Sequence, residues 1–400
     1  MVEGWNYSLL SSVCEEITSG GAAPQGDKYF INGRYPFVRV VDMGNLQGKK
    51  LMSQTRDMIN DDGTVKLHLF PKGTILFTKS GASLLLNQRA ILNEPMFVVS
   101  HIGCLIPNEN VISDWLYYWM KTVDFNVYAH ATTLPSLKLT TIKGLTIPVP
   151  PIPEQERIVA RIEELFSQLD AGVETLKKTK AQLAVYRQAV LKEAFESVIP
   201  ESTTCNVEDV CKDIKVGIVI KPAQYYTSAD IGVRAFRSAN VREFAVNDSD
   251  WVYLTKAGHE ANLRSEIHTG DVLVVRSGYP GTACVVPPAY NGCNAIDILI
   301  AVPDVEKILP EYLCAYTNSP LGRKIVQEKK RGVAQAHFNV SGYSKTPIIV
   351  PCMKMQKRVV AEIDARLSEC DSIEQTVDMA LQQAEALRQS ILKDAFEGRL

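Results

Sequence analysis

The chain contains an ungapped internal repeat at an offset of 201 residues, about half of its 400 residues. Residues 147–197 align with residues 348–398, and 19 of the 51 aligned positions are identical. The identities cluster around Gln155 and Gln356 near the start of each copy, and again near the end of each copy. A repeat constrains the fold strongly, because each copy must adopt a similar unit. The repeat predicts two half-molecules in tandem, each a globular head followed by a long helix.

Both copies of the repeat carry a seven-residue apolar period, which is typical of a left-handed coiled coil. Each helix is expected to run for about 43 residues, or roughly 65 Å at 1.5 Å per residue. Prolines precede the first helix and favour its start near Pro153. The coiled-coil residues predicted from the period are Ile158, Ile162, Leu169, Leu176, Leu183, Val190, Val359, Ile363, Ile373, Val377, Leu387 and Ile391.

The two helices are expected to pair with each other inside the chain. Small residues of the second copy, such as Cys370 and Ala384, leave room for the larger Leu169 and Leu176 of the first. Antiparallel pairing is favoured because residues 198–351 separate the end of one helix from the start of the other. The alternative is that each helix finds its partner in another chain. In a mixed arrangement, the helices pair and the remaining apolar surface binds a partner subunit.

The segments before each helix show a weaker repeat at an offset of 197 residues. Residues 70–81 match residues 267–278, and residues 114–119 match residues 311–316. Short β-branched runs alternate with Gly and Pro turns, and one amphipathic helix per head follows. Two diverged heads in a common frame indicate two different recognition tasks.

The predicted fold class is α+β, with two tandem mixed α/β heads separated by two long helices. The helices are expected to form an antiparallel coiled coil, which gives the chain pseudo-twofold symmetry. The predicted segments are a first head at 1–150, a central helix at 151–197, a second head at 198–351 and a C-terminal helix at 352–400.

Composition predicts a folded cytoplasmic protein. The chain is 46% hydrophobic, yet no stretch approaches 18 uncharged apolar residues, so no membrane span and no membrane partner are expected. A secretory signal is not recognised at the N-terminus. Nine cysteines lie scattered without a C-x-x-C pair, which favours reduced thiols over disulfides or a metal site.

The net charge of −2 conceals a local excess of basic residues. Between Arg323 and Arg331 there are five basic residues and one acidic residue. The run Lys329-Lys330-Arg331 precedes the loop 335–339 and is predicted to contact phosphate groups. A solvated charged surface is the alternative interpretation of such a run.

The sequence lacks the motifs of a catalytic site. The string from Gly44 to Lys50 fails the P-loop spacing, and no Gly-rich turn for a nucleotide cofactor follows a strand. The six histidines form no H-x-x-x-H or H-E-x-x-H motif. The sequence therefore predicts a non-catalytic protein. A nuclease with an unrecognised site is the alternative, and it would cleave DNA with Mg²⁺ as an isolated chain.

Two strings carry a resemblance to a known family. They are the stretch from Pro150 to Val159 (PPIPEQERIV) and the helix ends Leu191-Lys-Glu-Ala-Phe195 and Leu392-Lys-Asp-Ala-Phe396. With the duplicated heads, they resemble the specificity (S) subunit of Type I restriction–modification enzymes across essentially the whole chain. The second copy departs from the pattern, with Lys354-Met355 before Gln356.

The resemblance implies that each head is a target-recognition domain for one half of a bipartite sequence in double-stranded DNA. It implies that the helices set the half-site spacing and help dock two methyltransferase (M) subunits, which restriction (R) subunits join. No cofactor is then expected in this chain, because S-adenosylmethionine, ATP and Mg²⁺ belong to the partners. The alternative is a coiled-coil adaptor whose heads bind protein and not DNA.

Basic and polar side chains beside the matched motifs are the candidates for contact with DNA phosphates or base edges. In the first head the predicted residues are Arg39, Lys79, Ser80 and Lys138. In the second head they are Arg237, Arg276, Ser277, Lys329, Lys330, Arg331, Gln335, His337 and Asn339.

Overall fold

The computed structural model describes residues 2–46, 48–128, 136–324 and 339–400. These residues form two compact units, and each unit combines one head with parts of both long helices. The first unit comprises Met1–Leu176 and Met379–Leu400, and the second comprises Lys177–Asp378. The long helices are α5 (Ile152–Glu196) and α10 (Met353–Phe396), so each helix contributes to both units.

The described part of the first head contains three sheets and four α-helices. The sheet β2-β10-β7-β8-β4 is built from β2 (Cys14–Ser19), β4 (Leu51–Met52), β7 (Ile75–Thr78), β8 (Arg89–Leu92) and β10 (Ile102–Pro107). The sheet β5-β3-β9-β6 is built from β3 (Tyr35–Val38), β5 (Asp57–Ile59), β6 (Leu69–Phe70) and β9 (Met96–Val98). A separate pair joins β1 (Asn6–Leu9) to β11 (Thr146–Val149). The helices are α1 (Val40–Asn45), α2 (Asp61–Thr64), α3 (Ser113–Thr122) and α4 (Leu139–Lys143).

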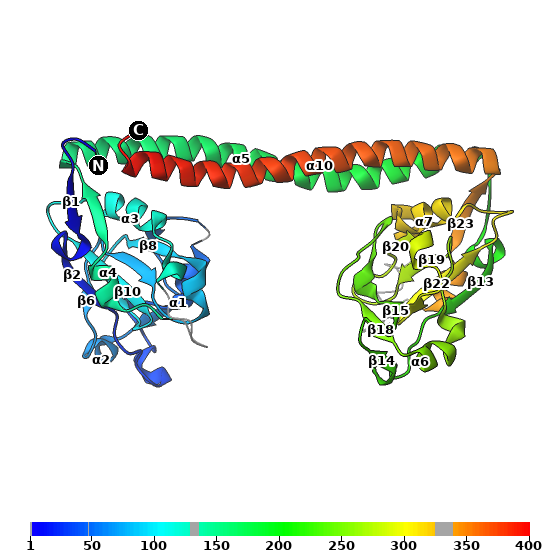
Figure 1. Cartoon of the computed structure of the whole chain (residues 1–400), viewed down its shortest axis with the longest axis horizontal. Helices are drawn as coiled ribbons and strands as arrows, with labels where there is room; N and C mark the ends of the chain where they lie inside the picture. The colour runs from blue at the N-terminus through cyan, green and yellow to red at the C-terminus, as the bar shows by residue number, and fades with distance from the viewer. Residues whose placement is uncertain (1, 47, 129–135, 325–338) are drawn as a thin grey trace. The chain divides into compact units, whose positions relative to one another are not determined.

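Alternating side chains give the central sheet of the first head two apolar faces. Ile75 and Phe77 of β7 point into a core shared with α3 and the long helices, while Leu76 points into a core shared with the second sheet. Trp115 of α3 is fully buried in the first of these cores. Figure 1 shows α3 between the strands of this head and the helical ends of its own unit.

The second head repeats this plan. Its central sheet β13-β22-β19-β20 is built from β13 (Cys211–Val216), β19 (Val272–Val275), β20 (Ala283–Val285) and β22 (Ile298–Pro303). The sheet β14-β18-β15-β21 is built from β14 (Tyr226–Thr227), β15 (Val233–Phe236), β18 (Val252–Leu254) and β21 (Asn294–Ala295). The two-stranded sheets pair β12 (Ser202–Asn206) with β23 (Pro347–Pro351) and β16 (Val241–Arg242) with β17 (Ala245–Val246). The helices are α6 (Lys256–Glu260), α7 (Pro310–Asn318) and α9 (Val340–Ser344).

Strand register shows which residues of the two heads correspond. Thr78 of β7 lies opposite Ile102 of β10, and Val275 of β19 lies opposite Ile298 of β22. The parallel bridge from Gly21 to Val99 in the first head recurs from Ile218 to Ile296 in the second. The predicted class of two tandem mixed α/β heads with long helices is therefore confirmed.

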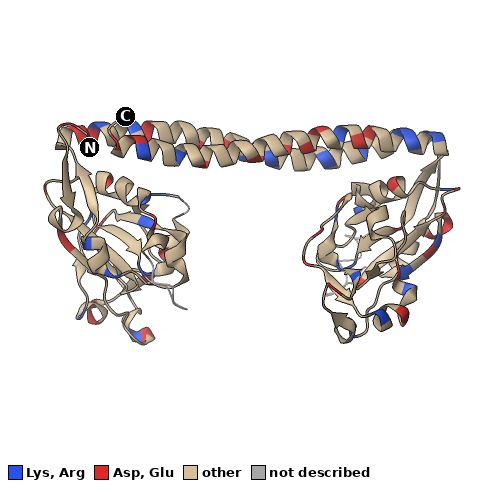
Figure 2. Ribbon diagram, in the orientation of Figure 1, with Lys and Arg blue, Asp and Glu red and all other residues tan. Residues whose placement is uncertain are grey.

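Within each unit the long helices run antiparallel, as the sequence predicted. In the second unit Lys180 of α5 binds Asp378 of α10 at 2.6 Å, and Arg187 binds Asp371 at 2.5 Å. As the residue numbers rise along α5, the residue numbers of their partners on α10 fall, which shows that the helices are antiparallel. In the first unit the equivalent pair joins Arg388 to Asp170. Figure 2 shows charges of both signs interspersed along the two helices.

Most of the predicted coiled-coil residues lie in the helix interface or in the cores next to it. The buried ones are Ile158, Ile162, Leu183, Val190, Val359, Ile363, Val377 and Ile391. Leu169 and Leu176 are half-buried. Ile373 and Leu387 were expected in the interface, but their side chains are 46% and 51% exposed. A pair of helices buries only a narrow stripe of each helix, which here follows the heptad position of Ile363 and Val377. The heptad position of Ile373 and Leu387 lies beside this stripe, so these two side chains face outward.

None of the helices in the described ranges is both long and apolar enough to cross a membrane.

Candidate nucleic-acid interface

A buried glutamine joins each head to the start of the long helix that follows it. Oε1 of Gln155 accepts a hydrogen bond from the backbone N–H of Ile112 at 3.0 Å. Nε2 of Gln155 donates to the carbonyl oxygens of Asn110 and Pro150, both at 2.8 Å. The side chain is fully buried, so all its polar atoms require such partners.

Gln356 repeats these contacts in the second unit. Its Oε1 accepts from the N–H of Leu309 at 2.9 Å, and its Nε2 donates to the carbonyl oxygens of Lys307 and Pro351 at 2.9 and 3.0 Å. The glutamine of the Pro-rich helix start is thus a structural residue that ties the helix to the loop before α3 or α7. This explains why it is identical in both copies of the repeat.

The phenylalanine at the end of each long helix contacts a head aromatic. Phe396 of α10 lies against Trp115 of α3, with ring centroids 4.5 Å apart. Phe195 of α5 packs against Tyr312 of α7 in an edge-to-face arrangement at 5.2 Å. Each head is therefore held by the start of one long helix and the end of the other. The glutamine at the start of one helix and the phenylalanine at the end of the other thus lie at this junction in each unit.

Arg39 and Arg237 were predicted to contact DNA, and the structure gives them internal partners. The backbone N–H of Arg39 donates to Oδ2 of Asp42 at 2.7 Å, and its guanidinium pairs with Asp57. Arg237 makes the equivalent backbone bond to Oδ1 of Asn240 at 3.0 Å. Both arginines precede a short helix, and the polar residue three positions later closes its first turn. The structure therefore supports a role for this repeated pattern in local structure.

Lys79, Ser80 and Lys138 come together on the first head. The carbonyl oxygen of Lys79 accepts a hydrogen bond from the N–H of Leu137 at 2.9 Å, and Ser80 forms a bridge with Ser136. Lys138 is exposed, and Lys79 is half-buried. No ion pair within the described ranges involves either lysine, so both ammonium groups are available to an anion. Lys138 therefore lies close to Lys79 and Ser80, from which it is distant in the sequence.

Ser80 also contacts a residue that the sequence did not single out. Its Oγ lies 2.9 Å from Nδ1 of His101, which lies opposite Lys79 where the neighbouring strands β7 and β10 meet. In the second head the equivalent cross-strand pair is Arg276 and Asp297, whose Nη1 and Oδ1 are 2.6 Å apart. The same place thus carries a Ser–His contact in one head and an ion pair in the other. Only the strand register could reveal this correspondence.

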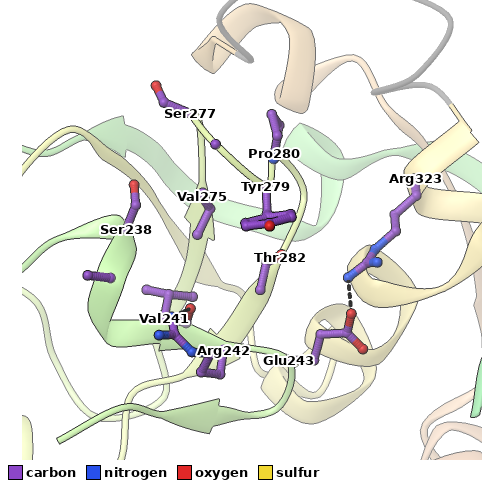
Figure 3. A pocket seen from close by; sticks show the side chains of 12 residues that line it. Ser238, Val241, Arg242, Glu243, Val275, Ser277, Tyr279, Pro280, Thr282 and Arg323 are labelled. Carbon is purple, nitrogen blue, oxygen red and sulfur yellow. Dashed lines mark hydrogen bonds and ion pairs between the residues drawn. The ribbon is translucent and has the colours of Figure 1, made fainter. Parts of the chain in front are cut away.

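Ser277 lines a pocket of about 720 Å³ in the second head. Arg242, Glu243, Tyr279 and Arg323 also line it. Figure 3 shows the Tyr279 ring between Ser238 on one side and the Arg323–Glu243 pair on the other, and that pair is joined at 2.7 Å. The pocket is open, basic on balance and next to the predicted Arg276–Ser277 segment.

Asn339 is exposed and caps α9, since its side chain accepts a hydrogen bond from the N–H of Gly342 at 2.8 Å. Lys138 occupies the corresponding position before α4, without a side-chain cap. The remaining predicted residues lie outside the described ranges: Lys329, Lys330, Arg331, Gln335 and His337.

The described side chains offer no evident centre for metal or thiol chemistry. No group of three or more His, Cys, Asp or Glu in the described ranges is placed to hold a metal ion. Burial raises the pKa of the Cys14, Cys211 and Cys284 thiols to about 12, which keeps them protonated at neutral pH. The exposed polar and basic groups of the heads are suited to binding an anionic surface.

Comparison with known proteins points to one family. Residues 2–184 match the family described as the Type I restriction modification DNA specificity domain. The specificity subunit of the Type I restriction enzyme EcoKI from Escherichia coli K12 is 22% identical, over 100% of this chain and 89% of that subunit. The EcoBI specificity subunit from Escherichia coli is 25% identical, over 69% of this chain and 62% of that subunit.

Solved structures share the fold of the chain. The HsdS subunit from Thermoanaerobacter tengcongensis matches with a TM-score of 0.58 and 17% identity, over 100% of this chain and 98% of that one. A chain described under "Structural basis underlying complex assembly and conformational transition of the type I R-M system" matches with a TM-score of 0.79 and 17% identity, over 100% and 99% of the two chains. With two heads of one plan and antiparallel long helices, the chain is similar over its whole length to Type I restriction–modification specificity subunits.

Proposed function

We propose that this chain gives a Type I restriction–modification complex its DNA sequence specificity. Each head reads one half of a bipartite target in double-stranded DNA, and the two long helices set the distance between the halves. One observation carries this proposal. The two heads share strand register and the buried glutamine contacts, yet they differ just before β10 and β22, at His101 and Asp297. Two heads that share a fold but differ in their accessible residues can recognise two different half-sites.

The exposed charges support binding to a DNA backbone. Lys79 and Lys138 lie beside one another on the first head, and Arg242 and Arg323 line the pocket of the second. Cationic side chains of this kind hold phosphates and fix the register of a protein on DNA, while nearby polar and apolar side chains read the base edges. The net charge of −2 does not oppose this, because α5 and α10 together carry 16 acidic and 13 basic residues, a net charge of −3, which leaves the rest of the chain at +1.

The chain works with partner subunits. Two methyltransferase subunits dock on it, and restriction subunits join them. Ile373 and Leu387 support docking along the helices, because large apolar side chains exposed on a helix favour burial against another protein. The chain itself is not an enzyme, and S-adenosylmethionine, ATP and Mg²⁺ belong to the partners. It acts in the cytoplasm.

A methylation map tests the proposal. The chain is co-expressed with a Type I methyltransferase subunit, and modified adenines are mapped across the host genome with and without this chain. We expect one bipartite motif to be methylated only when the chain is present. Methylation that does not depend on the chain, or no methylation in the assembled complex, would contradict the proposal.

Replacing one head tests the proposal that each head reads its own half of the target independently. Substituting residues 1–146 with the corresponding head of a relative should change one half of the motif and leave the other half unaltered. Cleavage of DNA by the isolated chain with Mg²⁺ would instead favour a nuclease.

A further inference from the structure

The same connection in both heads exposes large apolar side chains. It joins two neighbouring strands of the central sheet, β7 to β8 through residues 79–88 and β19 to β20 through residues 276–282, and we name these segments the central loops. In the first head Leu85 and Leu86 are 54% and 66% exposed. In the second head Tyr279 is 85% exposed. Exposed side chains of this size at equivalent places are costly in water unless a partner covers them.

The central loop of the second head is held in a defined shape. The N–H of Val275 donates to the carbonyl oxygen of Thr282 at 2.9 Å, and the N–H of Gly281 donates to the carbonyl oxygen of Val275 at 3.0 Å. Gly278 and Gly281 have φ of +82° and +88°, which favours glycine. The Arg276 side chain, only 14% exposed, pairs with Asp297 at the base of the loop. Tyr279 is therefore presented on a fixed turn.

The central loop of the first head is also ordered, by different means. Its residues form the 3₁₀ helix η3 (Ala82–Leu86), in which Leu84 is fully buried while the next two leucines face outward. Thr78 Oγ1 donates to the carbonyl oxygen of Ser83 at 3.1 Å, and Asn87 ends the turn with φ of +50°. The loop is three residues longer than its counterpart, ten residues against seven. The two heads thus present different apolar shapes from one position of the fold.

Cations flank both central loops, which favours DNA as the partner. Lys79 and Lys138 lie at the start of the first loop, and neither has an ion pair among the described residues. Arg242 lines the pocket beside Tyr279, and its guanidinium also has no ion pair within the described ranges. An apolar tip with basic side chains around it is complementary to a groove of DNA, where phosphates border the base edges and the thymine methyl groups.

We propose that the central loops read bases in the major groove, with Tyr279 as the specificity-determining residue of the second head and Leu85 and Leu86 as those of the first. Their apolar side chains contact thymine methyl groups and base edges, while the flanking cations hold phosphates. The cross-strand contacts Ser80–His101 and Arg276–Asp297 hold the residues at which the central loops begin. This inference rests on the proposed function and names the residues that carry it out.

The test compares two variants of the assembled complex with matched controls. Tyr279→Ala and the double variant Leu85→Ala with Leu86→Ala are each co-expressed with the methyltransferase subunit and a plasmid library of randomised targets. The methylated sequences are then read out. Ile231→Ala and Val65→Ala serve as controls, because both residues are exposed apolar side chains away from the central loops. All four variants remove exposed atoms and should leave the folded structure intact.

We expect Tyr279→Ala to relax discrimination by about tenfold at one or two positions of a single half-site, since single base pairs contribute on this scale. The double leucine variant should relax the other half-site, and the controls should retain the wild-type motif. An unchanged motif in both loop variants would overturn the inference, as would a uniform loss of methylation without altered preference. Failure of the wild-type complex to methylate any motif would instead contradict the proposed function.

Discussion

The side-chain oxygen of Gln155 accepts a hydrogen bond from the backbone N–H of Ile112, 3.0 Å away in the loop before α3. This bond fixes the first helical turn of α5 to the head that precedes it. Because the repeat supplies the same bond between Gln356 and Leu309, each head is attached to its helix in the same way. The heads can diverge at their exposed loops while the junction stays constant.

Removing the buried glutamine should destabilise the first unit. We expect Gln155→Leu to lower its free energy of unfolding by roughly 3 kcal/mol, because the N–H of Ile112 and the backbone carbonyls it contacted lose buried partners. Denaturant unfolding followed by tryptophan fluorescence, in a Trp251→Phe background, reports the first unit, which holds the other three tryptophans. Gln168→Leu, at an exposed position of the same helix, is the matched control. Equal effects of the two substitutions would argue against the assigned role of Gln155.

The paired lysines of the first head should determine part of the salt dependence of DNA binding. Each phosphate contact contributes about 0.9 to the slope of log K against log salt concentration, so Lys79→Gln with Lys138→Gln should reduce the slope by about two. Binding of the assembled complex to its target duplex is measured between low and moderate salt. Lys178→Gln, on the exposed surface of α5, is the control. An unaltered slope in the double variant would place these lysines outside the DNA contact.

Lengthening both long helices should change the spacing between half-sites. Seven residues inserted after Leu176 and seven after Asp378 add one heptad to each helix and preserve the seam, because the apolar period is seven. The insertion lengthens each helix by about 10 Å. A methylation map should then show a spacer longer by about three base pairs, at 3.4 Å per pair, with both half-sites intact. A motif with its original spacing would show that the helices do not set this distance.

Thiol labelling should distinguish the exposed cysteine from the buried ones. Cys352 is exposed, whereas Cys14 and Cys284 are buried and have pKa values raised by burial to about 12. At pH 8 a thiol-reactive dye should label Cys352 rapidly and the buried thiols only after denaturation, because the thiolate is the reactive form. Cys352→Ser should remove the fast phase. Rapid labelling of several thiols in the native chain would contradict the described packing.

The sequence predicted the architecture well because its strongest signals are periodic. The seven-residue period required two long helices, and the repeat required two similar heads. Periodicity also placed Ile162 and Ile363 correctly in the buried seam. It failed at Ile373 and Leu387, because period alone does not say how wide a stripe a two-helix pair can cover.

The candidate site was predicted less completely. The matched motifs led to Lys79, which has no ion pair among the described residues, but the same reasoning selected Arg39 and Arg276, whose guanidinium groups pair with Asp57 and Asp297. His101 and Asp297 were missed because each lies opposite its partner across strands far apart in the sequence. Tyr279 was missed because it follows the last matched residue, in a loop whose length differs between the heads.

The sequence by itself determined the duplication, the helical period and the resemblance to a family, because these depend on local spacing along the chain. The tertiary structure alone decided which polar residues make hydrogen bonds or ion pairs inside the protein and which are exposed. That choice depends on cross-strand register and on packing between distant segments, as with Gln155 against Ile112 and Arg276 against Asp297. No local pattern encodes those neighbours, so the surface that we propose for DNA binding forms only when the sheets are assembled.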